Sequence, residues 1–551
     1  MYCDKANVNI LSSLLPQAGI RDVVVCPGSR NALLVHDFYL MSQATDEHRL
    51  RVHPVTDERS AAFAVIGLSM ASHSPACVCV TSGSALLNTL PAVAEAFYRQ
   101  VPLLVISADR PRQWIGQLDG QTIEQDGALC PYAQTYTLNE TSSEESIRQC
   151  FDTAVAALSA LHYPHSEAGR PVHVNVPISE PLFSFTTPKL PDSSISLFST
   201  KQEGAIIPDS LVAKIASAHL PLLVIGQWDT PATAACAAIE EADSLLVLPE
   251  LISNLPNSRR TAAIEQHPEL ISSLCPDLVV HVGGNFVNKQ LKLALRRLPQ
   301  CVVIRVEETY GTPDTFQHLA FLIRGSAKAN LEALGQARLP RKAAVTKAKQ
   351  ILAQAAAAMD SIYPAPFSQE GIMRCVADFL HQHCISLTAL HLANSTVVRM
   401  ATRAFAEIGC PIYCNRGVNG IEGSLSVAAG HALGCPGLQL ALIGDLSFFY
   451  DQNALWNQAL GANLRIILFN NGGGRIFDTL PGLEQSPARG TLIAASHATS
   501  ARGIAESYHI HYHILTAETG MAEAIAWLLS ARDDRPSLLE IKLGGGKNNI
   551  L

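Results

Sequence analysis

The amino-acid sequence predicts an α/β protein built from three doubly wound parallel-sheet domains. Short, continuous apolar segments of strand length alternate with helical patterns through most of the chain, which is typical of parallel sheets covered on both faces. The chain has 551 residues, too many for one hydrophobic core. Hydrophobic residues make up 48% of it and charged residues 16%, which indicates well-buried globular domains with little disorder.

The individual elements follow in chain order. Residues 23–25, 51–55, 76–81 and 103–107 have the apolar, β-branched composition of strands, and residues 85–99 have a helical pattern between the last two. Later strands are expected at residues 222–225, 245–248, 278–282, 302–306, 440–443 and 464–469. In such sheets ligands bind beyond the carboxyl ends of the strands, so polar residues just after each strand are the first candidates for a site.

Two breaks divide the chain into the three predicted domains. Residues 183–208 are rich in Ser, Thr and Pro and lack a sustained period, which predicts a linker. A basic stretch at residues 338–342 precedes an alanine-rich helix. The domains are therefore expected at residues 1–185, 205–340 and 360–551, each of ordinary domain size.

Charge and cysteine usage exclude several classes of protein. The net charge of −8 argues against nucleic acid or an anionic membrane as the main partner, because both require a basic face. The fourteen cysteines form no CxxC pair and no zinc-like cluster, so we expect buried, reduced thiols and a cytoplasmic location. The first residues do not resemble a signal peptide, and no apolar run is long enough to span a membrane.

Two polar segments follow apolar strands in the last third of the chain. Gly444, Asp445, Leu446 and Ser447 come directly after residues 440–443, and Asn471 opens a glycine-rich run after residues 464–469. Carboxylate and amide oxygens together with phosphate oxygens are the ligands that magnesium prefers, and the amides of a helix start favour a diphosphate. Taken singly, Asp445 could instead be a helix cap and Asn471 part of an ordinary turn.

In combination, the two segments resemble the metal and diphosphate motif of thiamine diphosphate (ThDP) enzymes. In that family the spacing between Gly-Asp and the asparagine is about 25 residues, and a second Gly usually follows the Asp, where this chain has Leu446. The resemblance implies ThDP and magnesium as cofactors, with manganese as the alternative metal. It implies that the metal ligands are Asp445, Asn471 and Gly473.

Glu58 is the candidate for the carboxylate that a ThDP enzyme places against the aminopyrimidine ring of its cofactor. It follows the strand-like residues 51–55 and precedes an apolar helix. On local grounds alone, Asp57 and Glu58 could equally be an acidic first helical turn stabilised by the helix dipole. Two observations favour the catalytic interpretation. The chain also has the metal motif, and the TSG run at residues 81–83 follows Glu58 at the distance typical of these enzymes.

Further motifs give a closer resemblance, to the MenD family of 2-succinyl-5-enolpyruvyl-6-hydroxy-3-cyclohexene-1-carboxylate synthases. These are CPGSR at residues 26–30, DERSA at 57–61, TSGSA at 81–85, SADRP at 107–111, NSTVVR at 394–399, NRG at 415–417 and residues 470–481. The match covers both end domains in order. It is thinner in the middle domain, where residues 283–289 are the best anchor.

The resemblance implies the reaction and its substrates. The family decarboxylates 2-oxoglutarate and adds the resulting succinyl unit to isochorismate in a 1,4-addition, a step of menaquinone biosynthesis. Both substrates are dianions, and arginine suits them because its planar fork matches a carboxylate. The rival interpretations are an acetolactate-synthase-like or 2-oxoacid decarboxylase acting on pyruvate, and a ThDP-binding protein without turnover.

The site residues that the resemblance implies fall into two sets. The cofactor-binding positions are Glu58, Thr81, Ser82, Gly83, Ser395, Ile421, Gly444, Asp445, Leu446, Ser447, Asn471 and Gly473. The substrate-binding positions are Ser29, Arg30, Arg110, Gln121, Lys289, Arg399, Arg416, Ile476, Phe477 and Leu480. Ile421 matches the apolar residue that supports the thiazolium ring, and Gly120 stands where some relatives have Asn.

The resemblance also implies an assembly. ThDP enzymes of this architecture place the cofactor between the first domain of one chain and the third domain of another. We therefore expect a homo-oligomer, either a dimer or a dimer of dimers.

Overall fold

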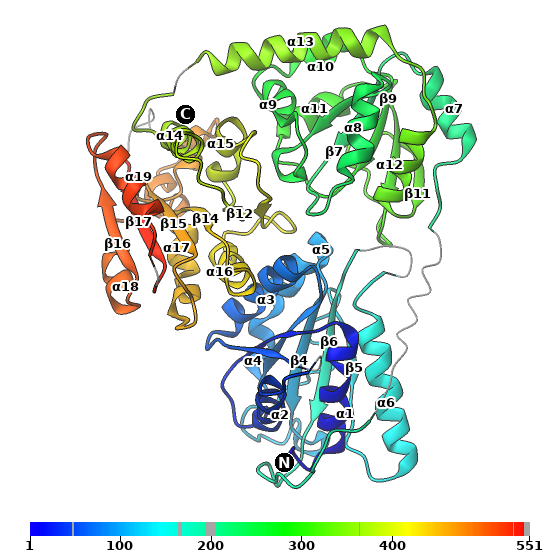
Figure 1. The fold of residues 1–551 in the computed structure, drawn as a ribbon, viewed down its shortest axis with the longest axis vertical. Coiled ribbons are helices and arrows are strands. Elements are labelled where there is room, and N and C mark those ends of the chain that lie inside the picture. Colours follow the sequence, from blue (N-terminus) through cyan, green and yellow to red (C-terminus); the bar gives the residue numbers. More distant parts are fainter. Residues whose placement is uncertain (47–48, 164–167, 193–203, 363, 533, 545–551) are drawn as a thin grey trace.

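Three parallel β-sheets, each covered by helices on both faces, make up the computed structural model of the chain (Figure 1). The structure describes residues 1–551 except 47–48, 164–167, 193–203, 363, 533 and 545–551, so part of the predicted linker at residues 183–208 lies outside the described residues. Within the described residues the paired strands of all three sheets are parallel, as is typical of continuous apolar strands separated by helices. The predicted fold class is confirmed. The domain limits stay a prediction.

The first sheet has the strand order β2-β1-β3-β4-β6-β5. Its strands are β1 Asp22–Val25, β2 Arg51–Pro54, β3 Ala76–Val80, β4 Leu103–Asp109, β5 Gln134–Thr137 and β6 Pro171–Pro177. Its helices are α1 Ala6–Leu14, α2 Ala32–Ser42, α3 Glu58–Ser72, α4 Ser84–Asn88, α5 Leu90–Arg99 and α6 Glu144–Ser159. The prediction of one continuous helix at residues 85–99 is wrong, because the structure has two helices there, α4 and α5. The break falls at Thr89, because Pro91 lacks the N–H that would continue the helix.

The middle sheet has the order β11-β10-β9-β7-β8. Its strands are β7 Pro221–Ile225, β8 Leu246–Pro249, β9 Leu278–Val282, β10 Val302–Glu307 and β11 Leu319–Arg324. Its helices are α7 Asp209–Ser217, α8 Thr233–Glu241, α9 Ser258–Gln266, α10 Glu269–Leu274, α11 Lys289–Arg296, α12 Ala327–Gln336 and α13 Ala343–Asp360. The alanine-rich helix α13 buries Val345, Ala348 and Leu352 in the core of this sheet.

The third sheet has the order β13-β12-β14-β15-β17-β16. Its strands are β12 Ala389–Leu392, β13 Ile412–Cys414, β14 Gln439–Gly444, β15 Leu464–Asn470, β16 His511–Leu515 and β17 Ser537–Lys542. Its helices are α14 Gln369–Gln382, α15 Thr396–Ala404, α16 Ser424–Gly434, α17 Asp445–Tyr450, α18 Arg502–Ser507 and α19 Met521–Leu529. Among the described residues no helix combines the length and apolarity needed to cross a membrane.

The first and third sheets are joined by the packing of α3 against α16, which lie side by side in Figure 1. Two glycines permit this approach. A Cβ on Gly430 would lie 2.0 Å from the Ala64 carbonyl oxygen, and a Cβ on Gly67 would lie 2.1 Å from that of Val427. The apolar cluster around α3 accordingly includes Ala389 of β12 and Val427 of α16. The two helix backbones therefore touch without intervening side chains.

We predict that Gly430→Ala destabilises the protein. The added methyl group has no space against the α3 backbone, so the helices must separate, and we expect the free energy of unfolding to fall by on the order of 3 kcal/mol. Denaturant unfolding of the purified protein measures this. Gly503→Ala in α18 is the matched control, because a Cβ there meets nothing within 4 Å and should be neutral or slightly stabilising. Equal stability of the two variants would contradict the prediction.

Candidate active site

Asp445 lies where β14 ends and α17 begins, and its carboxylate is buried. One oxygen accepts the Leu446 N–H at 2.7 Å. The other accepts the N–H groups of Asn471, Gly472 and Gly473 at 3.1, 2.8 and 3.0 Å. The tips of β14 and β15 are thus joined. Because Leu446 contributes its backbone amide, the contact does not depend on a glycine at that position.

The oxygen atoms around Asp445 fit a hard divalent cation. The side-chain oxygen of Asn471 is buried and accepts no hydrogen bond, which leaves it free for a ligand. Gly473 has φ 139°, a conformation that favours glycine, and a Cβ there would lie 2.7 Å from the Ala494 carbonyl. A carboxylate, an amide oxygen and a backbone carbonyl are the donor set that magnesium accepts.

Several residues that the sequence interpretation missed support this loop. The Asn470 amide donates to Glu540 at 2.6 Å and to the Thr499 carbonyl at 2.8 Å, and Glu540 is fully buried. The His497 ring nitrogen lies 3.4 Å from the Asp445 carboxylate. Glu540 lies in β17 between apolar residues. A charged residue inside an apolar strand is the sequence signal that could have indicated a buried carboxylate bonded to this loop.

Glu58 is the first residue of α3, so it does lie in an acidic first helical turn. Its neighbour Asp57 caps the helix by accepting the Arg59 and Ser60 amides, so the capping role belongs to Asp57 and leaves the Glu58 carboxylate available. The Asn88 side chain donates to Glu58 at 3.2 Å. Among the described residues no hydrogen bond or ion pair joins Glu58 to Asp445.

The loops after β1, β3 and β4 bring several predicted substrate and cofactor residues together. Gly83 follows β3 with φ 86°, and a Cβ there would lie 3.3 Å from Gln121, so the two backbones are adjacent. The Arg110 guanidinium lies 3.5 Å from the Gln121 side-chain oxygen. Thr81 and Ser82 are buried beneath these loops. The missed residue Gln125 accepts the Gly83 N–H at 2.8 Å and holds the loop in place.

Arg30 is buried while its neighbour Ser29 is exposed. The Arg30 guanidinium donates to the Ile178 carbonyl at 2.8 Å and to Glu180 at 3.2 Å, and it lies over the Trp114 ring. Burial and the nearby positive charge of Arg110 lower the pKa of Arg30. Arg30 and Arg110 therefore form a region of positive charge at the end of the first sheet, suited to a carboxylate.

A second basic region lies where the middle and third domains meet. Arg416, in the loop after β13, is buried and donates to Asn394 at 3.2 Å and to the Phe286 carbonyl at 3.1 Å. Lys289 and Arg399 are exposed. Burial raises the pKa of Glu265, and the positive charges of Arg399 and Lys289 oppose that rise. Three predicted substrate residues from two domains are thus brought together, and an acidic residue that the sequence interpretation missed lies beside them.

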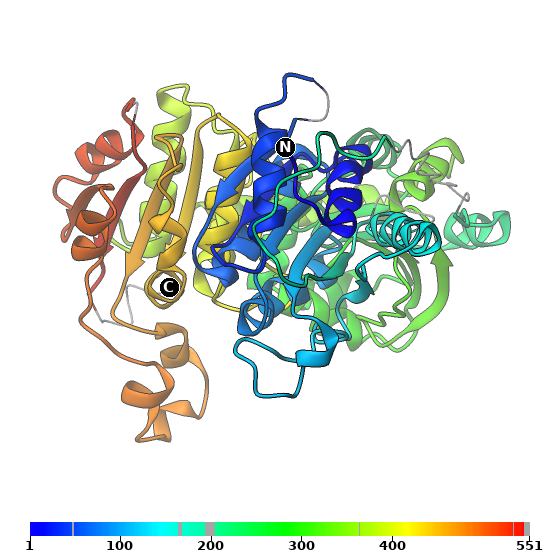
Figure 2. The same cartoon turned by 90° about the horizontal axis from the view of Figure 1, so that it is seen from below.

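The remaining predicted residues belong to the third domain. Ser395 has φ 71° at the start of α15, and the Ser447 hydroxyl donates to the Ile421 carbonyl, which ties two cofactor positions together. Ile421 is 42% exposed, and its cofactor-binding role stays a prediction. Ile476, Phe477 and Leu480 lie in and just after the 3₁₀ helix Arg475–Thr479. Figure 2 shows this orange segment projecting away from the three sheets.

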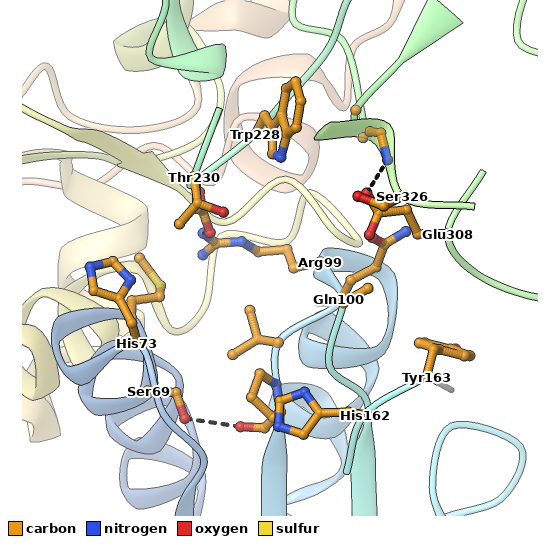
Figure 3. Close-up of a pocket in the computed structure, with 18 of the residues that line it drawn as sticks. Ser69, His73, Arg99, Gln100, His162, Tyr163, Trp228, Thr230, Glu308 and Ser326 are labelled. Carbon is orange, nitrogen blue, oxygen red and sulfur yellow. Dashed lines mark hydrogen bonds and ion pairs between the residues drawn. The ribbon is translucent and has the colours of Figure 1, made fainter. Parts of the chain in front are cut away.

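Two cavities accompany these residues. One, of about 740 Å³, is lined by Gly28 and Thr56 of the first domain and by Asn453 and Trp456 of the third, next to the loop of Ser29 and the start of α3. The other, of about 730 Å³, lies between the first and middle domains and contains none of the predicted site residues. Figure 3 shows Arg99, Gln100, Trp228 and Glu308 around it.

Comparisons with known proteins show which family this chain resembles along its length. The family model "Thiamine pyrophosphate enzyme, N-terminal TPP binding domain" matches residues 7–128. A 2-succinyl-5-enolpyruvyl-6-hydroxy-3-cyclohexene-1-carboxylate synthase of Phocaeicola vulgatus is 38% identical over 100% of this chain and 98% of its own. That of Bacteroides thetaiotaomicron is 37% identical over 98% and 96%. The chain belongs to this synthase family.

The fold of the synthase-family chain is also that of a solved structure. The crystal structure of benzoylformate decarboxylase from Polynucleobacter necessarius superposes with a TM-score of 0.72 over 99% of both chains, at 16% sequence identity. At this identity the likeness concerns the fold alone. Together with the family match, it confirms the three-domain ThDP-enzyme architecture, and membership of the family confirms thiamine diphosphate as the cofactor.

We predict a pH-dependent stability that originates at Glu250, which is buried beside Arg416. Burial raises the pKa of Glu250 from 4.5 to about 7, with repulsion from Glu265 adding to the rise and Arg416 opposing it. Because the folded protein holds the Glu250 proton more tightly than the unfolded chain does, Glu250 contributes most to stability below pH 4.5. This contribution is lost as the pH rises through 7.

The test compares the wild type with Glu250→Gln between pH 5 and pH 8. Gln keeps an oxygen for the Asn288 N–H, which Glu250 accepts at 2.9 Å, but it does not titrate. The stability of Glu250→Gln relative to the wild type should therefore increase over this range, by on the order of 2 kcal/mol. Parallel pH profiles of the two proteins would contradict the prediction.

Proposed function

We propose that this chain decarboxylates 2-oxoglutarate and adds the resulting succinyl unit to isochorismate, giving 2-succinyl-5-enolpyruvyl-6-hydroxy-3-cyclohexene-1-carboxylate in menaquinone biosynthesis. The observation that carries this proposal is 38% identity to such a synthase along the whole chain. The two basic regions support it, because a pair of dianionic substrates requires several cations at separate positions. A pyruvate-specific pocket would require the opposite, a small apolar wall.

The third domain would hold the cofactor through its metal. Asp445, the side-chain oxygen of Asn471 and the carbonyl of Gly473 would bind magnesium or manganese, and the amides at the start of α17 would face the diphosphate. Thiamine diphosphate, when bound, supplies the electron sink that lets a 2-oxo acid lose carbon dioxide and form a carbon–carbon bond.

The first domain would provide proton transfer and substrate contacts. Glu58 would share a proton with a ring nitrogen of the aminopyrimidine, which is the role of the carboxylate in this enzyme class. Arg30 and Arg110 would bind one carboxylate group and Arg399, Arg416 and Lys289 another. Ser29, Gln121, Ile476, Phe477 and Leu480 would complete the substrate pocket.

We further propose that the protein is a cytoplasmic homo-oligomer, a dimer or a dimer of dimers. The support for an oligomer is that Glu58 and Asp445 belong to different domains, and enzymes of this architecture complete the site with a second chain. The support for the cytoplasm is the set of fourteen cysteines, all of which are free thiols.

Turnover is tested directly by mixing the protein with ThDP, magnesium, 2-oxoglutarate and isochorismate. We expect isochorismate absorbance to fall, and we expect chelation of the metal to stop the reaction and its re-addition to restore it. A protein that binds the cofactor but consumes no isochorismate would contradict the proposal. So would release of succinic semialdehyde from 2-oxoglutarate at the same rate with and without isochorismate.

Glu58→Gln should lower kcat by roughly 100-fold or more, because the amide cannot share the proton. Binding of magnesium and ThDP, measured by calorimetry, should stay within a few fold of the wild type, since the diphosphate is held by the third domain. Glu144→Gln is the matched control, because Glu144 is the first residue of a different helix, α6, and should leave kcat unchanged. Loss of cofactor binding with undiminished residual kcat would contradict the assigned role.

A further inference from the structure

Helix α5 of the first domain buries a charged residue that none of the motifs includes. Glu95 is 1% exposed and lies among the buried residues Ala92, Val93 and Ala96 of the same helix. A buried carboxylate requires hydrogen-bond donors, because leaving it without them costs several kcal/mol. Figure 1 shows α5 at the end of the first domain that faces the other two, so these donors can come from a different domain.

The donors are two consecutive backbone amides of the third domain. One Glu95 oxygen accepts the Gly417 N–H at 2.9 Å, and the other accepts the Val418 N–H at 2.8 Å. The approach is so close that a Cβ on Gly417 would lie 2.6 Å from the Glu95 carbonyl and 2.9 Å from its carboxylate. Hydrogen bonds to an ionised acceptor are among the stronger ones, so this contact fixes the backbone just after Arg416.

The same loop is held on its other sides by residues from all three domains. The Asn285 side chain of the middle domain donates to the Gly417 carbonyl at 3.0 Å, and Asn394 donates to the Asn415 carbonyl at 2.6 Å. Arg99, one turn after Glu95 on α5, donates to the Asn415 side chain at 3.3 Å and to Asp229 at 2.7 Å. Figure 3 shows Arg99 extending toward the middle domain.

These contacts determine where the Arg416 side chain can lie. Its guanidinium donates to Asn394 and to the Phe286 carbonyl, so two fixed groups orient it once its backbone is fixed. Of the contacts to the loop, the Glu95 pair comes from the first domain and acts on the peptide units directly after Arg416. A shift of the loop would move the guanidinium away from a substrate carboxylate and weaken a bidentate contact that depends on geometry.

We propose that Glu95 is a positioning residue for substrate binding, which acts by holding the 416–418 loop so that Arg416 meets a substrate carboxylate. The inference rests on the substrate-binding role proposed for Arg416. Glu95 itself touches neither substrate nor cofactor. In this role Glu95 couples the first domain to a substrate contact of the third domain in the same chain. Loss of the Glu95 contact should therefore raise the KM for a substrate and leave kcat unchanged.

A double-mutant cycle tests this proposal, using Glu95→Gln, Arg416→Lys and the combined variant. Glu95→Gln keeps the shape of the side chain but places an NH2 group, which cannot accept a hydrogen bond, against one of the two backbone N–H groups. We therefore expect the KM of at least one substrate to rise about tenfold, with kcat within about threefold of the wild type. Arg416→Lys removes the planar fork and should raise the same KM. In the Arg416→Lys background, Glu95→Gln should add less than about twofold.

Two further variants separate positioning from stability. Gly417→Ala should reproduce the KM defect from the other side of the contact, and it provides the test if Glu95→Gln does not fold. Glu240→Gln, which alters an acidic residue paired with Arg260 at 2.7 Å in the middle domain, should leave both KM values unchanged. Thermal unfolding of every variant shows whether a change in KM follows from lost structure.

The proposal is overturned if the effects of Glu95→Gln and Arg416→Lys on KM add in full, or if Glu95→Gln alters only the melting temperature. It is also overturned, together with the assignment of Arg416, if Arg416→Lys leaves both KM values unchanged. In that last case the turnover of the wild-type protein still establishes the synthase activity, so the two failures can be told apart.

Discussion

The contact between the backbones of α3 and α16 is the constraint on which the arrangement of the molecule depends. Gly67 and Gly430 let the two helices approach until carbonyl oxygens occupy the space where side chains would stand. Glu58 begins α3, and the Ile421 loop leads directly into α16. The contact therefore fixes how the first domain is oriented on the third. Neither helix can shift far relative to the other, because no side chain lies between the two close-packed backbones and could adjust.

The parallel sheets decide where the chemistry can take place. Side chains after β1, β3, β4, β13, β14 and β15 all lie at carboxyl ends, where loops can vary without disturbing the core. Asp445 illustrates the advantage. Its carboxylate accepts four amides from two strand ends and so orders the loop that carries Asn471 and Gly473. The loop that the metal proposal depends on is therefore ordered by hydrogen bonds within the protein.

Charge is balanced across the domain boundaries. The cations predicted to bind substrate are accompanied by acids that the sequence interpretation missed, Glu180 beside Arg30 and Glu250 and Glu265 beside Arg416, Arg399 and Lys289. Arg30 and Arg416 are buried, and without a nearby acid such cations would be costly. Glu95 serves a related purpose at the backbone, since its buried carboxylate accepts the N–H groups of Gly417 and Val418.

The sequence by itself determined the α/β class, most of the strands near the site and the residues of both motifs, because strand composition and motif spacing are local properties. The break before Pro91 and the capping of α3 by Asp57 are local features that the sequence interpretation did not resolve. Only the tertiary structure decided that Glu95 and Glu540 are buried partners of distant loops. The Glu540–Asn470 and Glu95–Gly417 bonds join residues 70 and 322 positions apart, and the alternation of apolar and polar residues carries no information about which distant group a buried charge will meet.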